Sequence, residues 1–120
     1  MIISIDFDGT IVEHRFPEIG ELKEGAKEVI NWMVSRGHSV AIWTCRSRDN
    51  YVPGRDTLQE AIEFLNANGI KYHSVNDNVP GISFKPFPNI VADVYIDDKN
   101  LGGIPHWFTI KSMIQQMERN

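Results

Sequence analysis

The chain has 120 residues, of which 12 are Lys or Arg and 16 are Asp or Glu, so its formal charge is −4. This length suits a single domain spanning residues 1–120, and 42% hydrophobic residues are typical of a globular protein with its own core. The acidic balance argues against nucleic-acid binding through bulk positive charge. One cysteine, Cys45, cannot form an internal disulfide, which favours a reducing cytoplasm. No basic leader or long apolar stretch is present, so we expect no contact with a membrane.

The first part of the chain alternates short apolar runs with segments of helical periodicity. Residues 2–7 are apolar and β-branched and run into turn-forming residues, which predicts a buried strand. Apolar residues at helical spacing predict a helix over residues 22–34, and residues 39–44 are the second predicted strand. After a polar loop at residues 46–55, a capping box with Thr57 as the cap and Glu60 as its partner, followed by an apolar stripe, predicts a helix over residues 57–68.

The second part continues this alternation with one irregular interruption. Residues 70–75 and 90–96 are predicted strands, and a proline-containing loop at residues 76–89 separates them. Residues 106–117 are predicted to form an amphipathic helix. The order β-α-β-α-β-loop-β-α predicts right-handed crossovers and an α/β fold, a three-layer α/β/α sandwich around a central parallel sheet.

Four aspartates directly follow predicted strands, Asp6 and Asp8 after the first and Asp97 and Asp98 after the last. The carboxyl ends of parallel strands share one edge of the sheet, where open α/β sheets bind ligands. Two like charges about 4 Å apart cost about 4 kcal/mol at an effective dielectric of about 20, so clustered carboxylates need a cation. Mg²⁺ prefers such oxygen ligands. A solvated acidic loop or helix caps are the alternative, and they explain a single aspartate better than two pairs.

Four sequence motifs resemble those of the haloacid dehalogenase (HAD) superfamily. The run Asp6-Phe7-Asp8-Gly9-Thr10 resembles the first motif, and Thr44, at the end of the second predicted strand, resembles the second. Lys85 is the candidate for the third motif, and Tyr95-Ile96-Asp97-Asp98 resembles the acidic fourth. Together they cover nearly the whole chain, and their order is more specific than any one motif. The resemblance implies a HAD-like, Rossmann-type fold without a cap domain.

The resemblance implies a Mg²⁺-dependent phosphatase that hydrolyses a phosphate monoester, with phosphotransfer as a further possibility. Asp6 would attack phosphorus to give an aspartyl-phosphate, and Asp8 would be the general acid and then the general base. Thr44 would donate to a phosphate oxygen, and Lys85 would neutralise charge on the nucleophile and the phosphoryl group. The implied Mg²⁺ ligands are the side chains of Asp6, Asp97 and Asp98 and the backbone carbonyl of Asp8.

The third motif is the least regular of the four. The family commonly places its lysine at the start of a helix, whereas Lys85 lies in a short proline-rich stretch. Lys99 and Lys71 are alternatives that are less well placed in the order of motifs.

Several residues beside the motifs suggest how a phosphorylated substrate, a small molecule or a macromolecule, is bound. The expected substrate contacts are Gly9, Thr10, Cys45, Arg46 and Arg48. Together with Arg55 and with His14 and Arg15 of a short flap at residues 10–21, these arginines would form a basic rim for a second phosphate. Solvated loop charges explain the same residues equally well. A capless site is open, which suits a large substrate or closure by another subunit in a homo-oligomer.

Two other function classes also fit an acidic pocket on a parallel sheet. A receiver-type signalling domain is phosphorylated on aspartate, but its acidic pair follows the first strand and its phosphorylated residue follows a middle strand, unlike the order here. A catalytically silent domain would bind a phosphorylated ligand without hydrolysing it. A phosphoaspartate that lasts for hours would favour the first alternative, and Mg²⁺-dependent binding without hydrolysis would favour the second.

Overall fold

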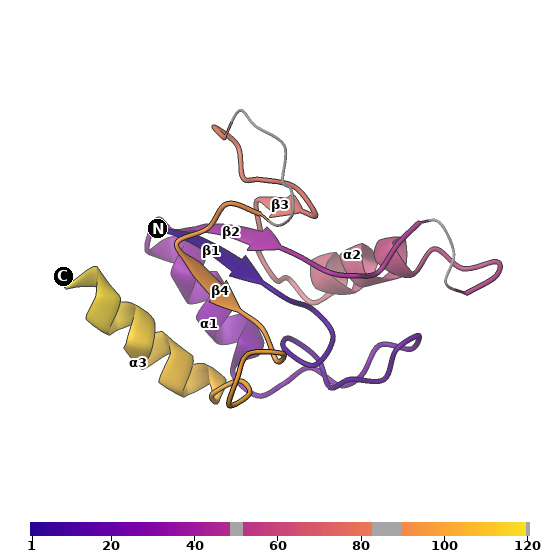
Figure 1. Ribbon diagram of the computed structural model, residues 1–120, viewed down its shortest axis with the longest axis horizontal. Coiled ribbons are helices and arrows are strands. Elements are labelled where there is room, and N and C mark those ends of the chain that lie inside the picture. The colour runs from indigo at the N-terminus through magenta and orange to yellow at the C-terminus, as the bar shows by residue number, and fades with distance from the viewer. Residues whose placement is uncertain (49–51, 83–89, 120) are drawn as a thin grey trace.

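The computed structural model describes residues 1–48, 52–82 and 90–119, and Figure 1 shows how its helices and strands are arranged. The strands are β1 (Ile2–Ile5), β2 (Ser39–Ile42), β3 (Ser74–Val75) and β4 (Val94–Ile96). The helices are α1 (Ala26–Ser35), α2 (Thr57–Ala67) and α3 (Trp107–Glu118). The described strands form one sheet in the order β3-β2-β1-β4, and every pair is parallel. The predicted α/β class and its central parallel sheet are confirmed.

The register of the sheet sets where the functional residues lie. β1 is central, and its last residue, Ile5, is level with Ile42 of β2 and Ile96 of β4. The next residue, Asp6, continues this pairing, since its backbone N–H donates to the Ile96 carbonyl at 3.0 Å. Three strands therefore end at the same level, and the residues that follow them meet at one edge.

All three helices contribute to one core on one face of the sheet. Alternate strand residues point to this face, among them Ile3 and Ile5 of β1, which are fully buried. They pack with buried helix residues: Ala26, Val29, Ile30, Met33, Ala61, Leu65, Trp107, Ile110 and Ile114. On the other face, Ala41 packs with Val79 and Ile90 of the connection between β3 and β4. The predicted three-layer sandwich would place helices on this face too, but the described part of the connection that covers it is loop. This connection contains prolines, which disfavour a helix.

All four strands are shorter than predicted, and β3 and β4 begin late because side chains take the place of backbone partners. The prediction starts the third strand at residue 70, but the His73 ring accepts the Val40 N–H at 2.9 Å, so β3 begins only after His73. The prediction starts the fourth strand at residue 90, but the Asp93 carboxylate accepts the Ile2 N–H at 2.7 Å, so β4 begins after Asp93. At both points a side-chain acceptor replaces a backbone acceptor, so the hydrogen-bonded strand begins later than predicted.

Helices α2 and α3 lie within one residue of their predicted bounds, with one change of cap. Helix α1 begins at Ala26 and not at residue 22, because Leu22 pairs with Val12 in an antiparallel bridge. Asp56, not Thr57, caps α2, since its carboxylate accepts the Gln59 N–H at 2.9 Å. The Thr57 hydroxyl donates to the Ser47 carbonyl at 3.3 Å instead. The longest described helix, α3, has 12 residues, and no helix among the described residues has the length and apolar character needed to cross a membrane.

Candidate active site

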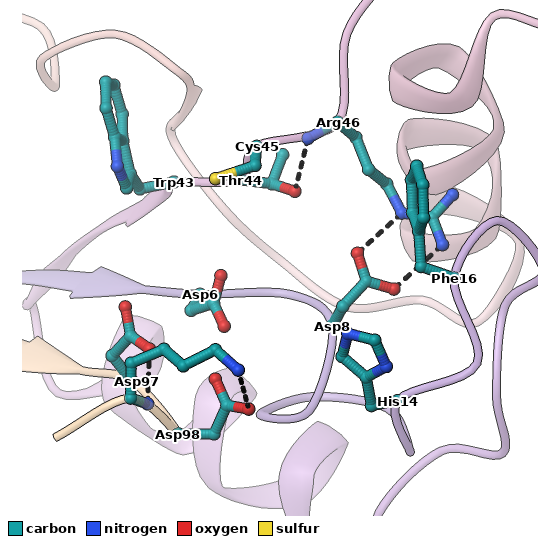
Figure 2. Close-up of a pocket in the computed structure, with 11 residues that line it drawn as sticks. Asp6, Asp8, His14, Phe16, Trp43, Thr44, Cys45, Arg46, Asp97 and Asp98 are labelled. Atoms are coloured by element: carbon teal, nitrogen blue, oxygen red, sulfur yellow. Dashed lines mark hydrogen bonds and ion pairs between the residues drawn. The ribbon is translucent and has the colours of Figure 1, made fainter. Parts of the chain in front are cut away.

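Three carboxylates meet at the carboxyl edge of the sheet, as Figure 2 shows. Asp6 follows β1, and Asp97 and Asp98 follow β4. Each offers one oxygen, and these oxygens lie within 4.8 Å of one another. They face a cavity of about 390 Å³, a size typical of small-molecule sites. The predicted meeting of the first and fourth motifs is therefore found in the structure.

The Thr10 hydroxyl joins the two strand ends that carry these carboxylates. It donates to Oδ2 of Asp6 at 3.2 Å and accepts the backbone N–H of Asp98 at 3.0 Å. Thr10 is fully buried, so a substrate cannot reach it. The prediction that Thr10 contacts the substrate is replaced by a positioning role, in which one hydroxyl orients Asp6 and fixes the start of the loop after β4.

Among the described residues, the carboxylate cluster has one long cationic contact, from the exposed Lys99 to Oδ2 of Asp98 at 3.9 Å. Burial, the charge of Asp97 and a hydrogen bond with Asp98 together raise the pKa of Asp6 from 3.8 to about 7. In the described structure, Oδ1 of Asp98 is buried and has no hydrogen-bond partner. Buried polar atoms are normally satisfied, so an orphaned carboxylate oxygen beside two further carboxylates fits a bound cation.

The raised pKa of Asp6 predicts how the metal-free protein responds to pH. Between the unfolded pKa of 3.8 and the folded pKa of about 7, the folded chain holds a proton that the unfolded chain has released. Raising the pH through this window therefore destabilises the folded protein. We expect Asp6→Asn to stabilise the chelator-treated protein by about 1–3 kcal/mol more at about pH 8 than at about pH 4, allowing for partial exposure. Urea unfolding at both pH values measures this difference, and equal effects would contradict it.

Gly9 allows the first motif to approach the fourth. Its φ is +81°, and a Cβ at this position would collide with Oδ2 of Asp98. Gly37 has a similar φ of +86°, but open space surrounds it. We expect Gly9→Ala to lower the free energy of unfolding by about 2–4 kcal/mol and Gly37→Ala by about 1 kcal/mol. Denaturant unfolding of the two variants tests this, and an equal cost would mean that the approach to Asp98 is unimportant.

Asp8 does not join the carboxylate cluster, because Arg46 holds both of its oxygens. Nε of Arg46 donates to Oδ2 of Asp8 and Nη2 to Oδ1, each at 2.8 Å. Nη2 also donates to the Glu18 carbonyl at 3.0 Å. Nη1 donates to the carbonyls of Pro17 at 3.3 Å and Thr57 at 3.2 Å. All five guanidinium N–H donors are used.

Arg46 is therefore a buried structural link and not a substrate contact as predicted. Its side chain is 0% exposed, and it joins Asp8, the flap and the start of α2. Its guanidinium also lies 5.3 Å from the centre of the Phe7 ring and 5.1 Å from that of Phe16. A substrate could take a hydrogen bond from Arg46 only by breaking one of these contacts.

The second motif lies on the cavity wall, where both of its residues can be reached. Thr44 and Cys45 line the cavity, and the Thr44 backbone N–H is held by Oδ1 of Asn76 at 2.8 Å. Oγ1 of Thr44 accepts the backbone N–H of Arg46 at 3.1 Å, so its own O–H is available to donate to a phosphate oxygen. Cys45 is exposed.

The predicted lysine of the third motif, Lys85, lies outside the described residues. Of its alternatives, Lys99 lines the cavity, with Nζ 3.9 Å from Oδ2 of Asp98 and a side chain that is 80% exposed. Lys71 precedes β3 and so lies toward the opposite edge of the sheet. Among the described lysines weighed for this role, only Lys99 lies at the cavity.

Lys23 supports the first motif in a way that the sequence analysis missed. Its Nζ donates to the Gly9 carbonyl at 2.7 Å. Nothing in the local sequence predicts this contact, because the two residues are brought together by the antiparallel bridge between Val12 and Leu22.

Two arginines of the predicted basic rim, Arg48 and Arg55, form ion pairs with carboxylates. Arg48 pairs with Asp56 at 3.2 Å. Arg55 pairs with Glu18 of the flap and with Glu60 of α2, each at 2.6 Å. Neither arginine lines the cavity. The expected substrate contact of Arg48 and the expected binding of a second phosphate are not supported by these positions.

Three rings line the cavity, although none was predicted to hold a substrate through its flat surface. His14 and Phe16 come from the flap, and Trp43 from the end of β2. Figure 2 places Trp43 on one side of Asp6 and the two flap rings on the other. Their clustering depends on the folded path of the flap, so sequence spacing alone could not reveal it.

Fold and site together define a small α/β protein with a carboxylate cluster at the carboxyl edge of its parallel sheet. No family model matches the chain, and a search of curated proteins finds no match. A solved structure of a conserved protein from Bacteroides thetaiotaomicron matches with a TM-score of 0.80 and 38% sequence identity. The match covers 98% of this chain and 91% of that chain. The chain belongs to the same family as this conserved protein.

Proposed function

We propose that the chain is a Mg²⁺-dependent phosphatase of the HAD type that hydrolyses a phosphate monoester through an aspartyl-phosphate on Asp6. The observation that carries the proposal is the cluster of Asp6, Asp97 and Asp98 oxygens within 4.8 Å of one another beside a cavity. Such a cluster is costly without a cation, and a cation beside a carboxylate nucleophile is what phosphoryl transfer requires.

The proposed metal ligands fit a small divalent cation. Asp6, Asp97 and Asp98 supply hard oxygen donors, and Oδ1 of Asp98 has no partner among the described residues. When bound, Mg²⁺ supplies positive charge that offsets the charge of the carboxylates and of the phosphate. The backbone carbonyl of Asp8 is a further proposed ligand.

Asp6 is the proposed nucleophile. Its bond from Thr10 orients the carboxylate before a substrate arrives. As the bond between Asp6 and phosphorus forms, the bond to the leaving alcohol breaks, and Thr44 donates its hydroxyl to a phosphate oxygen. Water then attacks phosphorus and releases inorganic phosphate, which regenerates the carboxylate.

Asp8 is the proposed acid and base of this cycle. It gives a proton to the leaving oxygen in the first step and takes one from the attacking water in the second. In the structure both of its oxygens accept hydrogen bonds from Arg46, each at 2.8 Å. Since a protonated carboxyl cannot keep both contacts, we include in the proposal that Asp8 releases one contact with Arg46 when it acts as the acid.

Release of inorganic phosphate from a panel of phosphate monoesters, with and without Mg²⁺, tests the proposal. We expect release to depend on Mg²⁺ and Asp98→Asn to need about tenfold more Mg²⁺ or to be inactive. Glu24→Gln is the matched control, because Glu24 is 81% exposed and lies outside the cavity. Metal-independent release would contradict the proposed site. A stable phosphoaspartate without turnover would favour a receiver domain, and binding without hydrolysis would favour a silent one.

A further inference from the structure

The cavity offers a substrate two chemically different regions. One region holds the carboxylates of Asp6, Asp97 and Asp98 with Lys99, whose Nζ is 3.9 Å from Asp98. The other region, on the side of Asp6 away from Trp43, holds the flap rings of His14 and Phe16. Of the described lining residues, only Arg46 and Lys99 carry a full positive charge at neutral pH, and all five donors of Arg46 are used. The flap region therefore has flat surfaces but no charged donor to spare.

The Phe16 ring and the backbone beside it both contact the buried Arg46. The Arg46 guanidinium lies 5.1 Å from the centre of this ring, and the same group donates to the carbonyl of the next residue, Pro17. Arg55 adds a second tie, through its pair with Glu18. An aromatic ring held in this way can bind another flat ring with little loss of side-chain entropy.

The direction of the proposed reaction decides which region of the cavity receives the alcohol part of the substrate. Asp6 attacks from one side of phosphorus, and the leaving oxygen departs on the opposite side, where Asp8 protonates it. Asp8 is 2.8 Å from the Arg46 guanidinium, and the same guanidinium contacts the Phe16 ring. The leaving group is thus directed toward the flap rings. Trp43 lies on the other side of Asp6, where it also lines a second pocket with Ser4 and Tyr95.

We propose that the substrate is a phosphate monoester whose alcohol part carries a flat, uncharged aromatic ring, and that His14 and Phe16 are the residues that select it. This inference rests on the proposed phosphatase function. It goes beyond that function because it names the class of leaving group and excludes a second phosphate as the main source of affinity.

Two pairs of substrates test the inference. Benzyl phosphate and cyclohexylmethyl phosphate have similar size and primary-alcohol leaving groups, but only the first is flat. We expect kcat/KM to be about tenfold higher for benzyl phosphate, the effect of one good aromatic contact. A hexose bisphosphate and the matching monophosphate form the second pair, and we expect less than a threefold preference for the bisphosphate.

Variants assign the preference to the flap. Phe16→Leu and His14→Leu are each expected to lower the ratio of kcat/KM between the two members of the first pair toward one. His14 is exposed, so its variant is expected to fold even if Phe16→Leu does not. Phe108→Leu is the matched control, because Phe108 is 49% exposed on α3 and does not line the cavity. It should keep the ratio of the wild type.

The outcomes separate the two proposals. Mg²⁺-dependent release from both members of a pair, with no preference for the flat one, would overturn this inference and leave the phosphatase intact. A strong preference for the bisphosphate would overturn it as well. Absence of release from every ester would instead contradict the phosphatase, and this inference with it. A preference for benzyl phosphate that the flap variants abolish and Phe108→Leu retains is the supporting result.

Discussion

Asp6→Asn is expected to lower Mg²⁺-dependent phosphate release by at least about 10³-fold, because an amide cannot form the acyl-phosphate bond. The substitution keeps the size of the side chain, so the fold is expected to persist. A steady-state assay of phosphate release, with circular dichroism of the same samples, measures both effects.

The comparison needs a carboxylate change of equal size away from the site. Glu24→Gln removes an exposed carboxylate and should retain the rate of the wild type. If Asp6→Asn keeps more than about a tenth of that rate, covalent catalysis on Asp6 is wrong.

Arg46→Met is expected to lower the free energy of unfolding by about 3–5 kcal/mol, the cost of breaking a buried ion pair from one side. The variant leaves Asp8 without its two 2.8 Å contacts and removes one donor from each of three carbonyls, those of Pro17, Glu18 and Thr57. The Pro17 carbonyl keeps a 3.4 Å contact from Arg55. The methionine side chain keeps much of the apolar stem, so the loss reports on the guanidinium. Urea unfolding at neutral pH measures it.

Arg48→Met provides the matched control on the same loop. Arg48 is 55% exposed, and its pair with Asp56 lies at the surface. Surface pairs contribute little, so we expect a change of about 1 kcal/mol or less. Similar costs for the two variants would show that Arg46 is not the link that joins Asp8, the flap and α2.

The order of the elements could be predicted from the sequence because each strand and helix carries its own periodicity. The ends of the elements could not, because they depend on distant partners. His73 accepts the Val40 N–H, and Asp93 accepts the Ile2 N–H across 91 positions of sequence. Nothing local distinguishes these side chains from those of ordinary strand residues. The cap of α2 was predicted one residue too late, since the carboxylate of Asp56 takes the role predicted for Thr57.

In the candidate site, too, some features could be predicted from the sequence and others depend on distant partners. Asp6, Asp97 and Asp98 could be predicted to meet, because parallel strands end at one edge. The role of Arg46 could not, because its acceptors come from three segments of the chain that only the fold brings together. Its place beside Thr44 suggested a substrate contact, whereas its burial makes it structural. Trp43 is partly exposed and lines the cavity, which its spacing in the sequence could not reveal.

Detection of the covalent intermediate tests the central claim most directly. The protein is mixed with Mg²⁺ and a small phosphate donor, quenched in acid within milliseconds, and digested for mass spectrometry, with borohydride reduction to convert an aspartyl-phosphate to homoserine. The account predicts a Mg²⁺-dependent phosphoryl group on the peptide that contains Asp6, its conversion to homoserine at that residue, and loss of both in Asp6→Asn. Steady phosphate release with an unmodified Asp6, or labelling of another residue at the rate of turnover, would contradict the account.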